Sequence, residues 1–160
     1  MVSSVCFTLH IATDCELPRL AWNEADRHVW VGDLDESSEA VKGHFSMPFV
    51  AYIGSDLNCG CGFRHLSFQN GDLSGEEEWP ISEGFVSTEG TERNHQELHA
   101  VLTDAHRRSP VVELYGCWAG EYDGKPEGER EIQPDDVLSE RFCFRERVLY
   151  RLQAGADNGP

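Results

Sequence analysis

The sequence is poor in basic residues: it has 13 Lys and Arg against 29 Asp and Glu in 160 residues, with a formal net charge of −16 at pH 7. This excess of negative charge repels phosphate backbones, so no nucleic-acid partner is expected. No apolar run has the length of a membrane span, which argues against a membrane protein. The first twelve residues lack a basic leader and therefore do not resemble an export signal.

Several enzyme motifs are also missing. The sequence contains no glycine-rich dinucleotide fingerprint, no phosphate-binding loop and no Gly-x-Ser-x-Gly elbow. The string from His95 to His99 differs from the His-Glu-x-x-His motif of zinc proteases, because its acid, Glu97, comes one position late and lies about 100° further round a helix. These absences favour a protein that is not an enzyme.

The overall composition is that of a globular protein, with 39% hydrophobic residues. We predict a single domain over residues 1–152 and a flexible C-terminal tail over 153–160. The expected location is the cytoplasm, where thiols stay reduced. Six cysteines, at positions 6, 15, 59, 61, 117 and 143, would then serve metal or redox chemistry rather than a disulfide framework.

The hydrophobic pattern predicts an α+β fold. Leu98, Val101, Leu102 and Ala105 form one apolar stripe on a helix over 94–108, for which Asn94 has the character of an N-cap. Strands are predicted over 5–12, 28–31, 49–53, 111–118 and 142–152, with a further one at 63–68 and a solvated acidic loop over 121–136. This order favours a largely antiparallel sheet with the long helix packed on one face.

Cys59-Gly60-Cys61 is the sharpest local feature of the sequence. Glycine between two thiols allows the bend that brings both sulfur atoms to one metal ion, and zinc is a possible cofactor. A complete site needs further ligands. We predict His65 and Cys117 for this role, and Cys6 and the helix histidines are the alternatives. The alternative is a glycine-rich turn with two small apolar side chains.

The second face of the sheet is predicted to be polar. Strand alternation assigns Cys6, Thr8, His10, Glu113, Tyr115, Cys117 and Arg145 to it. We take His10, Glu113, Tyr115 and Arg145 as candidate ligand-binding residues, although a solvated sheet face is the commoner outcome. Four arginines in the last strand, at positions 141, 145, 147 and 151, either bind an anionic ligand or pair with the acidic segment 121–136.

Three functions remain open from these observations. The preferred one is a small acidic cytoplasmic binding module, of the immunity or regulatory type, that acts on a basic protein partner. The first alternative is a thiol or metal site built around Cys59-Gly60-Cys61. The second is a small enzyme that works at an open polar face of the sheet.

Overall fold

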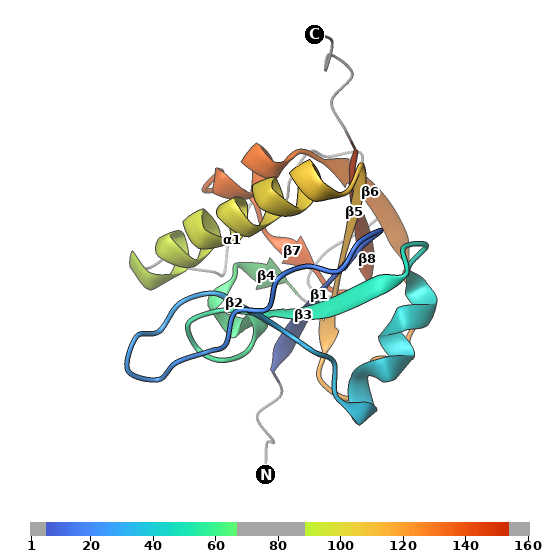
Figure 1. The fold of residues 1–160 in the computed structure, drawn as a ribbon, viewed down its shortest axis with the longest axis horizontal. Coiled ribbons are helices and arrows are strands. Elements are labelled where there is room, and N and C mark those ends of the chain that lie inside the picture. The colour runs from blue at the N-terminus through green and yellow to red at the C-terminus, as the bar shows by residue number, and fades with distance from the viewer. Residues whose placement is uncertain (1–5, 67–88, 154–160) are drawn as a thin grey trace, which may run out of the picture.

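The computed structural model describes residues 6–66 and 89–153 and has an α+β fold (Figure 1). Its elements, in chain order, are β1 (Phe7–Thr13), β2 (Trp30–Gly32), the 3-10 helix η1 (Glu36–His44), β3 (Phe49–Gly54), the 3-10 helix η2 (Gly60–Gly62), β4 (His65–Leu66), α1 (Glu89–Arg108), β5 (Val111–Trp118), β6 (Gly128–Ile132), the 3-10 helix η4 (Pro134–Leu138), β7 (Phe144–Arg145) and β8 (Val148–Gln153). Residues 1–5, 67–88 and 154–160 lie outside the described part of the chain, and the predicted tail lies there except for its first residue, Gln153, which ends β8.

Within the described residues, six strands form one sheet in the order β2-β3-β1-β5-β8-β6. All neighbours pair antiparallel except β6, which runs parallel to β8 at the edge. Strands β4 and β7 form a separate parallel pair. The prediction of a largely antiparallel sheet with one long helix is confirmed.

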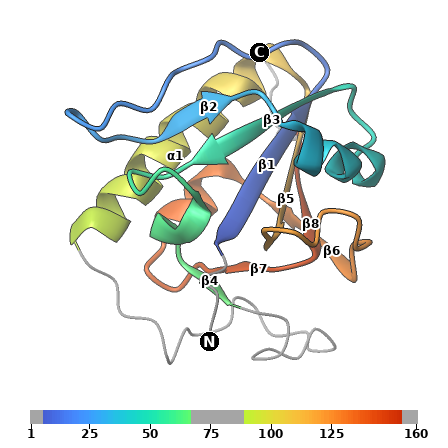
Figure 2. The same ribbon diagram turned by 90° about the horizontal axis from the view of Figure 1, so that it is seen from below.

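The helix α1 covers one face of this sheet. Leu98, Leu102 and Ala105 of its predicted stripe are buried in the main core. The alternate residues Phe7, Leu9 and Ile11 of β1 meet the same core, because they share one face of the strand. Figures 1 and 2 both place α1 on the opposite side of the sheet from the coil of residues 36–44.

The start of α1 differs from the prediction. The helix begins at Glu89, so Asn94 lies inside it rather than at its N-cap. Asn94 is buried, and its amide binds Asp56 and the carbonyl of Gly62. A polar residue in a helix interior resembles a cap in the sequence, because the residue types that cap a helix also suit such tertiary hydrogen bonds.

The acidic segment 121–136 is not a loop throughout, which corrects the prediction. It contains β6 and the start of η4, and Gly128–Ile132 pairs residue by residue with Val148–Leu152. An edge strand is exposed on one side and tolerates charges there, so its composition resembles a loop. Its apolar anchor is Ile132, which is buried in the main core.

The predicted single strand 142–152 is divided in two. β7 ends at Arg145 and β8 begins at Val148. Between them, Arg147 has a φ of 65°, in the left-handed region that a continuous strand does not use. Phe142, Phe144 and Tyr150 nevertheless belong to the same core, so the pattern placed the side chains correctly but not the turn.

The second sheet face is covered, which overturns the expectation of an open polar surface. Tyr115, Cys117 and Leu149 form a second buried cluster with Val41 of η1. Partly buried Leu34, Phe45, Val50 and Tyr122 pack around it. The centre of the sheet, where β1 pairs with β5, is therefore enclosed between α1 and η1 with the loop that follows β5. No helix among the described residues combines the length and apolar character needed to cross a membrane.

Candidate metal centre

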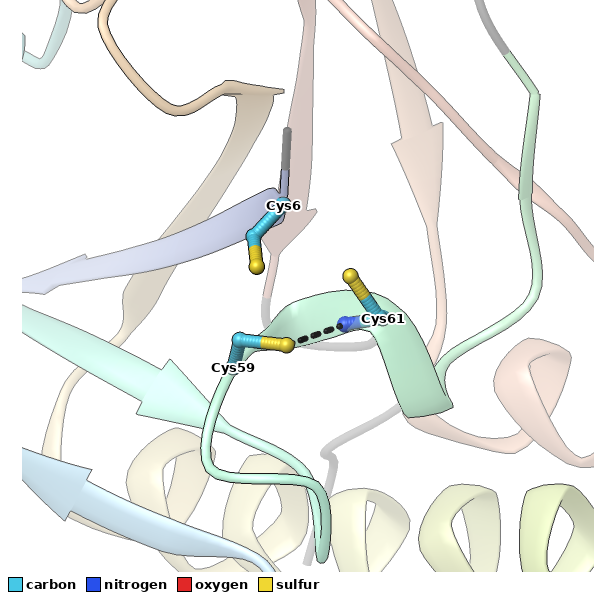
Figure 3. A group of neighbouring side chains, drawn as sticks. All are labelled: Cys6, Cys59 and Cys61. Carbon is cyan, nitrogen blue, oxygen red and sulfur yellow. Dashed lines mark hydrogen bonds between the residues drawn. The ribbon is translucent and has the colours of Figure 1, made fainter. Parts of the chain in front are cut away.

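Three cysteines meet at the end of the sheet where β1 begins. Cys6 directly precedes β1, Cys59 is the N-cap of η2 and Cys61 lies within η2. Their sulfur atoms all lie within 4.8 Å of one another, and each residue is half-buried. Figure 3 shows the three side chains turned toward a common space from two segments that are far apart in the sequence. We call this group the cysteine trio.

The loop before η2 is folded around Ser55. The backbone N–H and the hydroxyl of Ser55 both donate to the carbonyl of Cys59, at 2.7 and 2.6 Å. The same hydroxyl accepts from the N–H of Gly62 at 3.0 Å. Asn58 completes the turn with a φ of 68°, which asparagine tolerates better than most residues. These bonds fix the path of the chain on both sides of Cys59-Gly60-Cys61.

Helix α1 holds the same loop from the other side. The side chain of Asn94 accepts from the N–H of Asp56 at 3.0 Å and donates to the Asp56 carboxylate at 2.9 Å. Arg93 adds an ion pair to that carboxylate at 3.2 Å. The loop is thus preorganised by bonds that involve no cysteine side chain.

Gly60 brings the loop against β1. A Cβ atom at this position would lie 2.7 Å from the carbonyl oxygen of Phe7. Any larger residue would therefore push the loop away from the strand that carries Cys6. Glycine is needed here for close approach, and not for a left-handed backbone.

Backbone amides point at two of the sulfur atoms. The N–H of Phe7 donates to Sγ of Cys61 at 3.3 Å, and the N–H of Cys61 donates to Sγ of Cys59 at 3.4 Å. Such bonds favour the thiolate over the thiol. Burial acts more strongly in the opposite direction, and it raises the pKa of Cys59 to about 12. Without a metal ion, the Cys59 thiol therefore holds its proton at neutral pH.

Tyr52 of β3 lies beside the trio. Burial raises the pKa of its phenol, and the neighbouring Cys59, Tyr122, Cys6 and Cys61 act in the same direction. The indole of Trp30 stacks on the Tyr52 ring with centroids 5.0 Å apart. Tyr52 thus borders the trio, with Trp30 stacked on its ring.

The other predicted metal ligands lie elsewhere. Cys117 is buried on β5, where its Sγ lies 3.5 Å from the hydroxyl of Thr8, and burial raises its pKa to about 11. The ring of His65 stacks on Phe7 at a centroid distance of 4.5 Å, and its Nδ1 lies 2.6 Å from the carbonyl of Phe63. Neither residue belongs to the trio. Cys6, weighed only as an alternative, supplies the third sulfur.

The helix histidines serve the fold. His95 accepts from the N–H of Arg64 through Nε2 and donates to the carbonyl of Val137 through Nδ1, both at 2.9 Å. Burial lowers its pKa to about 4, and Arg64 acts in the same direction. His99 bonds to Asp135 at 2.8 Å instead of sharing a ligand with His95.

The four candidate ligand-binding residues do not form an open site. His10 and Tyr115 are register partners in β1 and β5, and they are fully buried with Glu113. Glu113 accepts hydrogen bonds from the Ser46 and Met47 backbone amides and pairs with Arg151 at 3.0 Å. Arg145 lies in β7, in the other sheet.

The arrangement of the trio suits a thiophilic metal ion. Zinc–sulfur bonds near 2.3 Å place tetrahedral thiolates about 3.8 Å apart. The trio requires its sulfur atoms to close by about 1 Å at most, which side-chain rotation supplies. Thiolates also bind copper(I) and iron, so sulfur alone defines a class of metals.

Comparison with known proteins gives no relative: no family model, no curated protein and no solved structure matches this chain. Within the described residues, the cysteine trio is a group of three donor atoms that lie close enough together to hold one metal ion.

Proposed function

We propose that the protein binds one thiophilic metal ion, with zinc as the first candidate, through Cys6, Cys59 and Cys61. The observation that carries this proposal is the convergence of three sulfur atoms within 4.8 Å from segments more than fifty positions apart. The prefolded loop around Ser55 supports it, because a ligand set held by independent hydrogen bonds loses little entropy on binding.

A cytoplasmic location is part of this proposal. All six cysteines are free in the structure. A reducing compartment keeps the trio available as thiols, whereas an oxidising one favours disulfides. Metal binding then releases protons from thiols and leaves metal-bound thiolates.

Protein purified without chelator and equilibrated with zinc is expected to hold about one zinc ion per chain. The variant with Cys6→Ser, Cys59→Ser and Cys61→Ser is expected to hold none, because serine hydroxyls are poor zinc ligands at neutral pH. Elemental mass spectrometry on gel-filtered protein measures the content, and circular dichroism shows whether the variant is folded.

Cys15→Ser is the matched control for this experiment. Cys15 is half-buried like the trio but lies away from it, with its thiol 3.5 Å from the carbonyl of Arg108. The control is expected to retain the full zinc content. Wild-type protein without zinc, or a folded triple variant that retains it, contradicts the proposal.

A second candidate function is the binding of a basic protein partner through the acidic segment 121–136. The observation that favours it is that the neighbouring arginines already form ion pairs. Arg147 pairs with Glu127 at 3.1 Å, and Arg151 pairs with Glu129 at 2.9 Å. These cations are already engaged, which leaves the exposed acids Glu121, Asp123 and Glu131 in excess.

Neutralising this excess is expected to weaken binding of a lysine-rich peptide. The variant with Glu121→Gln, Asp123→Asn and Glu131→Gln should bind oligolysine about tenfold less tightly at low salt, since each lost charge removes part of the local field. Calorimetric titration at two salt concentrations measures the effect. A control with Asp14→Asn, Glu16→Gln and Asp26→Asn changes the net charge equally, so equal losses in both variants contradict a localised binding surface.

A further inference from the structure

Resting on the proposed metal site, we infer that the centre keeps one exchangeable coordination position and binds an exogenous thiol there. The structural basis is a ligand count of three. Among the described residues, no fourth Cys, His, Asp or Glu places a donor atom with the trio. Zinc completes a tetrahedron with four ligands, so three protein ligands leave one position open.

The sequence supports a count of three protein ligands. All six cysteines and all seven histidines lie within residues 6–66 and 89–153. The remaining segments therefore contain no sulfur thiolate or imidazole that can close the site. Of the usual zinc ligands, they contain carboxylates alone.

All three cysteine residues are partly exposed. A small ligand can therefore reach a bound ion directly.

A thiol suits the open position better than water does. A fourth sulfur donor completes the four-thiolate ligand set that structural zinc sites use, whereas water places a hard oxygen donor among soft thiolates. On binding, the thiol R–SH gives its proton to solvent, a metal–sulfur bond forms and the coordinated water leaves. No electron is transferred, so no oxidant or reductant is required. The ligand class is thus a small monodentate thiol.

Cobalt(II) in place of zinc makes this step visible. Wild-type protein loaded with one equivalent of Co²⁺ under argon should show sulfur-to-cobalt charge-transfer absorption from three thiolates. Titration with 2-mercaptoethanol is expected to raise that absorption by about a third, because a fourth cobalt–sulfur bond adds to three. Ethylene glycol, which replaces the thiol by a hydroxyl, is expected to leave the spectrum unchanged.

The outcomes separate this inference from the metal site itself. If Co²⁺ gives no charge-transfer band, the metal site is absent and both proposals fail. If the band forms but the thiol does not change it, the position is closed and this inference alone is overturned. Loss of the band on thiol addition, with cobalt found in the filtrate, also overturns it, because the thiol then removes the ion instead of joining it.

Discussion

Replacing Gly60 with alanine is expected to lower the zinc affinity of the protein about 10- to 100-fold, the range seen when groups that position metal ligands are changed. The added Cβ would lie 2.7 Å from the carbonyl oxygen of Phe7 and 3.2 Å from its ring. Because real Cβ atoms do not approach oxygen so closely, the loop or the strand must move. Competition with a chromophoric zinc chelator measures the affinity.

The loop, and not the strand, is expected to give way. The first residues of β1 are held from β5 and from the segment that follows it: Phe7 is the register partner of Trp118, and the N–H of Ala119 donates to the carbonyl of Cys6 at 2.8 Å. A displaced loop carries Cys59 and Cys61 away from Cys6 together. The ion then has two ligands in place of three.

Gly43→Ala is the matched control, because a Cβ at Gly43 meets nothing within 4 Å. This variant should bind zinc as the wild type does. An unchanged affinity in the Gly60→Ala variant would mean that the approach of the loop to β1 does not position the trio, which removes the structural account of the site. Circular dichroism of both variants checks that the fold is retained.

The fold class could be predicted because its main signals are local. The stripe of Leu98, Leu102 and Ala105 lies within one helix, and the alternation of Phe7, Leu9 and Ile11 lies within one strand. Both patterns are set by which side chains face the core. The helix start differs from the prediction because Asn94 makes its hydrogen bonds to Asp56, a contact that no local pattern contains.

The candidate site could be predicted only in part. Cys59 and Cys61 are visible as a pair because their spacing is short, whereas Cys6 joins them through a long-range contact between η2 and β1. One sequence does not say which segment reaches the start of which strand. His65 and Cys117 were equally plausible partners by residue type, and only the three-dimensional arrangement separates them from Cys6.

The second sheet face was misjudged for a different reason. Tyr115 and Cys117 alternate with apolar residues, so a sequence pattern assigns them to a wet surface. The element that covers them, η1, is largely polar and contributes a single fully buried apolar side chain, Val41. Because η1 has so few apolar residues, its sequence does not predict that it packs on the sheet. The enzyme hypothesis depended on that face being open.

Two buried histidines are expected to lower the stability of the protein by about 4 kcal/mol between pH 8 and pH 5, and His65, whose pKa burial also lowers, acts in the same direction. Burial lowers the pKa of His95 to about 4 and that of His10 to about 3. In the unfolded chain both rings take up a proton below about pH 6.5, while the folded protein keeps them neutral. The unfolded state therefore binds more protons in this window, and acid favours it by about 2 kcal/mol per ring at pH 5.

Urea unfolding of metal-free protein at pH 8 and pH 5 measures this difference. Carboxylates contribute little in the window, because their unfolded pKa values lie near 4. His95→Gln retains an acceptor for the Arg64 amide and a donor for the Val137 carbonyl, and it should halve the pH dependence. If the variant is too unstable to fold, NMR titration of the wild-type imidazole resonances tests the prediction instead. The resonances of His10 and His95 should not titrate between pH 8 and pH 5. Titration of both contradicts the prediction.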